Sequence, residues 1–243
     1  MLRFVLLFVL CCSALTGRAA EVLVLGDESY APVISQQSSG PSGVLVDVLR
    51  FASSDMHVPI VIRLYPWKRA YELSLRQGAG IVGISYTAER AKRFDFSDPI
   101  YDDNINIVVM HGHEFPFSGP SDLRGKRVGG QVGASYGEAT DQALAGALVE
   151  IDRDVNQVAR LRKLMVGHLD CAIIGNGVVG LQHIIESDPD LQMHAHEFVI
   201  LPIPLARDAL FLAFPKEARQ APFLAEFNRS LARWVAQNRK TGP

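Results

Sequence analysis

Residues 85–101, SYTAERAKRFDFSDPIY, place an arginine behind a short run of hydroxyl-bearing residues. The guanidinium of Arg90 is a planar fork that can hold a carboxylate through two parallel hydrogen bonds. Gly83 and Ser85 come just before it and can add a backbone carbonyl, an amide and a hydroxyl. The pattern indicates either a carboxylate-binding site or a solvated arginine in a charged loop, and position alone does not separate the two.

A second candidate anion site lies in QVGASYGEATDQ, residues 131–142. Glycine-rich backbone leads directly into a predicted helix, with Ser135 as the expected N-cap. Free backbone amides and the positive end of a helix attract anions. The same pattern also builds ordinary strand-to-helix turns. Because no Gly-Lys-Ser/Thr follows, it is not a nucleotide-binding P-loop.

Aromatic residues surround the end of the first predicted strand. In DESYAP, residues 27–32, Tyr30 can stack on a ligand and offer its hydroxyl as a hydrogen-bond partner. Tyr65 and Trp67 can wall the opposite side. Packing of these rings on the first predicted helix is an equal alternative for Trp67.

Catalytic and metal-binding patterns are weak in this sequence. There is no Gly-x-Ser-x-Gly motif, and Cys171 falls in a predicted buried strand, where cysteine usually acts as a small apolar residue. The pairs HGH (residues 111–113) and HAH (residues 194–196) lie in polar segments without neighbouring cysteines, and we interpret them as surface histidines. We therefore expect no catalytic residue, no metal and no cofactor.

The elements that position the candidate residues alternate between strands and helices. Apolar strands are predicted at residues 21–26, 58–65 and 80–85, with helices between them at 43–54 and 66–77. Pro66 stands at the start of the second helix and Gly78 just after its end, as helix boundaries require. This order predicts a parallel sheet wrapped by helices, and such sheets bind ligands at the carboxyl ends of their strands.

A second strand–helix series follows a polar stretch rich in proline and phenylalanine. Because this series repeats the alternation of strands and helices, it predicts a second α/β lobe. The strand and helix near the C-terminus have no partner series of their own, so they must return to one of the lobes. We predict a first lobe at residues 21–104, a second lobe at residues 105–204, and a return crossing with the rest of the first lobe at residues 205–243.

The first twenty residues, MLRFVLLFVLCCSALTGRAA, have the layout of a secretory signal peptide: an early arginine, a short apolar run and small residues at the end. We therefore expect export to a periplasm. Removing this segment leaves 22 basic against 26 acidic residues, a net charge of −4. A mildly acidic chain does not favour nucleic acid or anionic membranes as partners.

Several segments together resemble the family 3 bacterial solute-binding proteins, the periplasmic receptors of polar amino-acid ABC importers. The segments are YAPV, SGVLVDVLRFA, GISYTAERAKRFDFSDPIY, DLRGKRVGGQVGASY and VGHLDCAIIG. They cover nearly all of the chain after the signal peptide, in the family's order. The resemblance implies the type II periplasmic binding protein fold: two α/β lobes joined by two strands, with the ligand in the cleft between them and closure by hinge motion.

The resemblance also implies roles for individual residues. Arg90 would clamp the ligand α-carboxylate, with contacts from Gly83 and Ser85. The turn from Gly133 to Ser135 would supply further amides. The remaining predicted ligand-binding residues are Asp27, Tyr30 and Gly175.

One position departs from the family pattern. Family members that bind α-amino acids usually place an aspartate five residues after the one matching Asp170, where it pairs with the ligand ammonium; here that position is Gly175. There is no acidic residue from Ala172 to Val179. Unless Asp27 or Glu28 reaches the ammonium, the sequence favours a ligand without one, such as an organic acid.

The resulting hypothesis is a monomeric periplasmic receptor that captures a small carboxylate-bearing solute, an amino acid or a related organic acid, for a membrane ABC permease. Two alternatives stay open. One is an enzyme resembling cyclohexadienyl dehydratases, which would need a positioned acid. The other is a module that senses a solute without transporting it.

Overall fold

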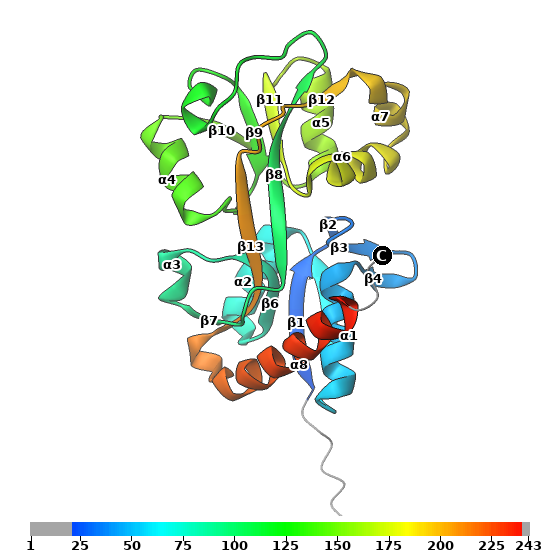
Figure 1. Cartoon of the computed structure of the whole chain (residues 1–243), viewed down its shortest axis with the longest axis vertical. Helices are drawn as coiled ribbons and strands as arrows, with labels where there is room; N and C mark the ends of the chain where they lie inside the picture. The colour runs from blue at the N-terminus through cyan, green and yellow to red at the C-terminus, as the bar shows by residue number, and fades with distance from the viewer. Residues whose placement is uncertain (1–20, 240–243) are drawn as a thin grey trace, which may run out of the picture.

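The computed structural model describes residues 21–239, so the predicted signal peptide lies outside the described residues. The described chain forms two α/β lobes, one above the other in Figure 1. Two long strands, β8 (Tyr101–Met110) and β13 (Ala206–Pro215), run side by side from one lobe to the other. On this arrangement we propose the lobe boundaries 21–104, 105–204 and 205–243.

The first lobe is built on three parallel strands, as the strand–helix alternation predicts. Strand β1 (Val22–Asp27) pairs with both β5 (Ile60–Tyr65) and β6 (Gly80–Ser85), and β13 adds to β6 in the antiparallel sense. The covering helices and smaller elements are α1 (Val44–Asp55), α2 (Trp67–Gln77), α3 (Ala88–Ala91), β7 (Phe94–Phe96), and a small sheet of β2 (Ser29–Tyr30), β3 (Ile34–Gln37) and β4 (Gly40–Ser42).

The boundaries of α2 follow the local sequence. Pro66 precedes the first helical residue, and Gly78 ends the helix in the left-handed conformation at φ 67°, which glycine adopts without steric cost. The helix ends therefore agree with the prediction.

The C-terminal helix α8 (Ala221–Arg239) belongs to the core of the first lobe. Phe223 and Phe227 pack in one apolar cluster with Leu45 and Leu49 of α1. Figure 1 shows α8 lying across α1 at the far end of this lobe. A segment distant in sequence thus closes the lobe that begins the chain.

The second lobe is a mixed sheet flanked by helices. Strand β9 (Val128–Gln131) pairs in parallel with β10 (Ile151–Asp154) and β11 (Cys171–Ile174), while β11 and β12 (Phe198–Ile200) pair antiparallel with β8. The helices are α4 (Glu138–Gly146), α5 (Gln157–Met165), α6 (Gly177–Glu186) and α7 (Pro189–Met193), with 3₁₀ turns at Pro120–Leu123 and Ala195–Glu197. A further 3₁₀ turn, Lys216–Ala218, follows β13 in the first lobe. Among the described residues, no helix is long and apolar enough to cross a membrane.

The two crossing strands join the lobe sheets into one hydrogen-bonded path, in the order β10-β9-β11-β8-β13-β6-β1-β5. Their antiparallel register runs from Tyr101 opposite Leu210 to Ile105 opposite Ala206. Within it, Asp103 lies directly opposite Asp208. These strands therefore carry acidic side chains to the junction between the lobes.

Candidate ligand-binding site

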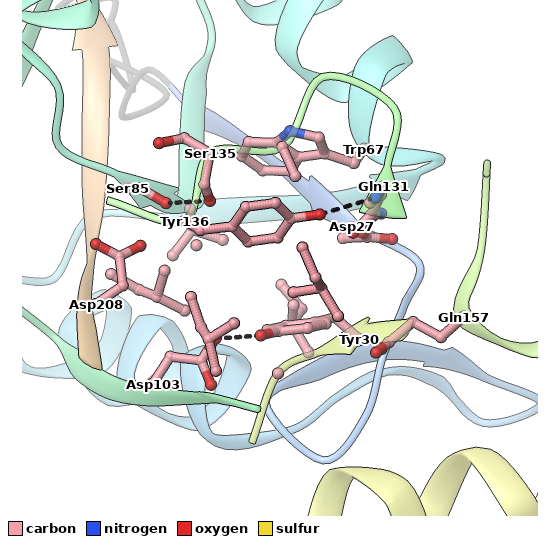
Figure 2. A pocket seen from close by; sticks show the side chains of 18 of the residues that line it. Asp27, Tyr30, Trp67, Ser85, Asp103, Gln131, Ser135, Tyr136, Gln157 and Asp208 are labelled. Carbon is pink, nitrogen blue, oxygen red and sulfur yellow. Dashed lines mark hydrogen bonds between the residues drawn. The ribbon is translucent and has the colours of Figure 1, made fainter. Parts of the chain in front are cut away.

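A cavity of about 60 Å³ lies between the lobes, measured as the space open to the centre of a water molecule. Its walls come from both lobes and both crossing strands (Figure 2).

The structure brings six of the eight predicted ligand-binding residues to this cavity. They share positions at strand ends or in the turns that follow, and they are Asp27, Tyr30, Gly83, Ser85, Ser135 and Gly175. Arg90 and Gly133 do not line it. Trp67, for which packing was the alternative, does line the cavity and is also 6% exposed within the first-lobe core.

Asp27, at the end of β1, is buried and fully engaged by donors of the chain itself. One carboxylate oxygen accepts hydrogen bonds from the Ser29 amide at 2.9 Å and hydroxyl at 3.1 Å. The other accepts from Gln131 Nε2 at 2.6 Å, a bond that joins the two lobes. Burial raises the pKa of Asp27, and these hydrogen bonds oppose the rise. With its oxygens occupied, Asp27 is a poor partner for a ligand cation.

Tyr30 reaches across the cavity to the crossing strand β8. Its hydroxyl donates a short hydrogen bond to Asp103 Oδ2, while the Asn176 amide donates to Asp103 Oδ1 at 2.7 Å. Burial, together with the charge of Asp103, raises the pKa of Tyr30 well above its usual value. Tyr30 therefore stays a neutral hydrogen-bond donor.

Arg90 sits beside the cavity, buried among carbonyl oxygens and aromatic rings. Nη1 donates to the Ser85 carbonyl at 2.9 Å, and Nη2 donates to the Gly133 carbonyl of the second lobe at 3.3 Å. The guanidinium also lies 5.9 Å from the ring centre of Trp67 and 5.7 Å from that of Tyr71. Burial lowers the pKa of Arg90. In this arrangement Arg90 ties the lobes together, and its part as a carboxylate clamp stays a prediction.

The turn from Gly133 to Ser135 differs locally from the sequence expectation. The prediction that Ser135 caps the following helix was wrong, because α4 begins at Glu138 after Gly137 and has no side-chain cap. Gly137 takes φ 86°, which spaces the helix away from the turn. Ser135 instead donates to Asp141 Oδ2 at 2.5 Å, and its carbonyl accepts from Ser85 Oγ at 3.2 Å.

Two aspartates on the crossing strands were not predicted from the sequence as site residues. Asp103 and Asp208 both line the cavity, with 2% and 8% of their surfaces exposed. Burial raises the pKa of Asp208 to about 6, and the neighbouring charge of Asp103 adds to the rise. Asp103 lies in phase with the buried Ile105 and Ile107 of β8, so strand alternation could have placed it on an inward face.

Arg160 is the arginine that does line the cavity. It is 2% exposed; Nη1 donates to the Ile173 carbonyl at 2.7 Å and Nε lies 3.8 Å from Asp154 Oδ2. Nε and Nη2 have no hydrogen-bond partner among the described residues. In α5 it shares the buried face of Leu161 and Leu164, a helical spacing that was a usable signal.

The comparisons with known proteins match this architecture. The model of the bacterial extracellular solute-binding proteins, family 3, matches residues 22–240. The chain belongs to this family. Part of this family 3 protein is also 30% identical over 91 residues to the L-cystine-binding protein TcyJ of Escherichia coli strain K12, covering 37% of this chain and about a third, 34%, of that protein.

Solved structures of similar shape include a histidine kinase sensor domain with similarity to periplasmic binding proteins. Its TM-score is 0.77 at 23% identity, over 91% of this chain and 93% of that one. A second is a Gly52Ala mutant of arginine-bound ArgBP from T. maritima, with a TM-score of 0.72 at 21% identity over 88% of this chain and 95% of that one. A third is the arginine-, lysine-, histidine-binding protein ArtJ from Geobacillus stearothermophilus, with a TM-score of 0.72 at 21% identity over 90% of this chain and 91% of that one. These likenesses confirm the predicted two-lobed periplasmic binding protein fold.

Proposed function

We propose that this family 3 protein is a periplasmic receptor that captures a small carboxylate-bearing solute and delivers it to a membrane ABC permease. The observation that carries the proposal is the cavity between the lobes, walled by charged and polar side chains from both. A receptor needs such a site because ligand contacts from both lobes favour the closed arrangement over the open one.

The lobes also contact each other directly around the cavity. Trp67 Nε1 donates to the Gly133 carbonyl at 3.0 Å, and Gln131 bonds to Asp27. Each bond joins a first-lobe residue to a second-lobe residue, so it exists only when the lobes are together. These bonds contribute to closure, and the ligand supplies the rest.

For the carboxylate we propose Arg160 as the direct partner, since this side chain lines the cavity and its Nε and Nη2 donate no hydrogen bond to any described residue. Ser85 and Ser135, which also line the cavity, can add hydrogen bonds. Arg90 acts beside them by holding the Ser85 and Gly133 carbonyls in place. The small volume favours a solute of about the size of a small amino acid.

The test is direct. The protein is purified without added ligand, and mild unfolding releases the solute bound to it. The solute is then identified by mass spectrometry. Binding of the same compound to the refolded protein is then measured by calorimetry. We expect a carboxylate with a dissociation constant in the micromolar range or below; a protein that binds no small carboxylate would contradict the proposal.

Two specific observations keep the alternatives testable. The likeness to a sensor domain suggests a protein that senses a solute without transporting it. A permease gene beside the gene of this protein, together with ligand-dependent binding to that permease, would argue against sensing alone. Asp208, a cavity carboxyl with a pKa of about 6, is the kind of positioned acid that a dehydratase needs. We expect no turnover of prephenate or arogenate, and measurable turnover would make this protein an enzyme.

A further inference from the structure

Asp103 and Asp208 form a buried pair of carboxylates at the junction between the lobes. They occupy directly opposed positions of the antiparallel strands β8 and β13, so their side chains leave the ladder on the same face. Both line the cavity and both are more than nine-tenths buried. Two like charges in this position repel each other, and burying them without a counter-charge is costly.

The surroundings satisfy Asp103 more fully than Asp208. Asp103 accepts hydrogen bonds from the Tyr30 hydroxyl and the Asn176 amide. A hydrogen bond from the Ser85 side chain acts on Asp208 and lowers its pKa, but the Oδ2 atom of Asp208 is buried and has no donor among the described residues. The charged groups acting on Asp208 are Asp103, Arg90 and Asp141, and Arg90 directs its hydrogen bonds to backbone carbonyls instead. Asp208 therefore presents a free acceptor at the cavity wall.

The balance of charge in the cavity points the same way. Its lining contains three carboxylates, Asp27, Asp103 and Asp208, against the single cation Arg160. Asp27 already accepts from Ser29 and Gln131. The remaining negative charge thus lies on the crossing strands, where Arg90 is the cation that acts on Asp208. Figure 2 shows these two aspartates on one side of the pocket, with Gln131 and Gln157 on the other.

Gly175 explains why the acid is found here. A Cβ atom at position 175 would lie 2.8 Å from Asp103 Oδ2 and would overlap the Tyr30 phenol. The Tyr30 phenol, with the Asp103 carboxylate next to it, therefore occupies the space that a side chain at position 175 would enter. The acid that the sequence lacks after Asp170 is supplied from β8 and β13.

We propose that Asp208 accepts a hydrogen bond from the ammonium group of the solute, with the Asp103 carboxylate beside it adding negative charge, so that the ligand is an amino acid rather than a hydroxy or keto acid. This inference rests on the proposed receptor function and names the ligand class for that same cavity. The ammonium would donate to Asp208 Oδ2 and shield the two carboxylates from each other. It reverses the sequence-based expectation of a ligand without an ammonium.

The experiment compares matched ligands and matched variants of the full chain after signal removal. Calorimetry at pH 7.5 measures the twenty amino acids, the 2-hydroxy acids with the same side chains (L-lactate against L-alanine, for example) and the corresponding amines. We expect the best amino acid to bind at least 10-fold more tightly than its hydroxy acid. Asp208→Asn and Asp103→Asn should each lower the amino-acid affinity at least 10-fold and change the hydroxy-acid affinity by less than about threefold.

Asp102→Asn is the control, because Asp102 is the exposed neighbour on the same strand, and it should leave both affinities unchanged. Thermal melts establish that each variant is folded. If one variant does not fold, the preference of the wild-type protein for amino acids over hydroxy acids still tests the inference. Equal binding of the hydroxy acid, or unchanged affinity in both cavity variants, would overturn the inference while leaving the receptor function intact. If neither the amino acids nor the hydroxy acids bind, both this inference and the receptor function are overturned. Tight binding of the amines alone would support the ammonium site and contradict the proposal that the solute carries a carboxylate.

Discussion

The phenol of Tyr30, in the first lobe, occupies the space above the α-carbon of Gly175, in the second. The two residues meet only because the lobes are in contact, and any Cβ at position 175 would overlap the Tyr30 ring. The absence of a side chain at position 175 therefore lets the two lobes meet here, which is a steric reason for the departure from the family pattern.

Restoring the family's acid by Gly175→Asp should damage binding rather than improve it. Because the overlap arises between lobes, each lobe should still fold, with a melting temperature within a few degrees of wild type. The affinity for the solute should fall on the order of 100-fold, because the lobes no longer close. Small-angle scattering should show an extended form that ligand does not compact.

The matched control for this variant is Gly146→Asp, at a position where a Cβ meets nothing within 4 Å. Combining Gly175→Asp with Tyr30→Ala should recover part of the affinity by removing the ring. A Gly175→Asp protein that closes normally around ligand would contradict this account.

Asp208→Asn should stabilise the ligand-free protein and flatten its pH dependence. The folded-state pKa of Asp208 is raised from 3.8 to about 6 by burial, so the folded state holds its proton more tightly than the unfolded state. Its contribution to stability is present below about pH 4 and is lost as pH rises through about 6. The shift corresponds to at most about 3 kcal/mol at pH 7.5.

Thermal melts of wild type and Asp208→Asn at pH 4.5, 6 and 7.5 test this directly. We expect the variant to gain several degrees at pH 7.5 and little at pH 4.5. The neighbouring charges of Asp103, Arg90 and Asp141 are unchanged in both proteins, and Asp102→Asn again serves as control. A gain that is equal at all three pH values would show that proton binding by Asp208 is not its cause.

Trp67→Phe isolates one hydrogen bond that joins the lobes. Phenylalanine keeps an aromatic ring in the buried position but removes Nε1, which donates to the Gly133 carbonyl. A neutral hydrogen bond contributes about 0.5–1.5 kcal/mol, so ligand affinity should fall roughly 2- to 10-fold. Calorimetry gives the affinity, and an unaltered value would mean that this bond does not favour closure.

Arg160 and Arg90 should respond differently to removal. Truncating one partner of a buried charge pair costs about 2–5 kcal/mol, so Arg160→Gln should weaken carboxylate ligands by at least 30-fold while sparing matched amines. Arg90→Ala should weaken carboxylates and amines to a similar degree, about 10-fold, because it loosens the contact between lobes. Calorimetry with both ligand classes distinguishes the two.

Arg162→Gln is the control on the same helix, since Arg162 is partly exposed and pairs with Asp188 and Asp190 away from the cavity lining. If Arg90→Ala instead abolishes carboxylate binding alone and Arg160→Gln does not, then Arg90 is the clamp that the family resemblance implies.

The sequence alone determined the local elements and part of the cavity lining. Alternating apolar strands and amphipathic helices predicted the parallel sheet, and Pro66 and Gly78 set the ends of α2. Tyr30 and Ser85 were found because the carboxyl ends of parallel strands gather at one edge. These features depend on neighbouring residues in the chain, so local pattern is sufficient to predict them.

Only the tertiary structure brought Asp103 and Asp208 together and placed Arg160, and not Arg90, in the cavity lining. The two aspartates are 105 positions apart, and their meeting depends on the register of the crossing strands. Whether an arginine faces a cavity or a carbonyl depends on how the two lobes approach each other. Local periodicity predicts neither the strand register nor the contact between the lobes, because both are set by the packing of segments far apart in the chain.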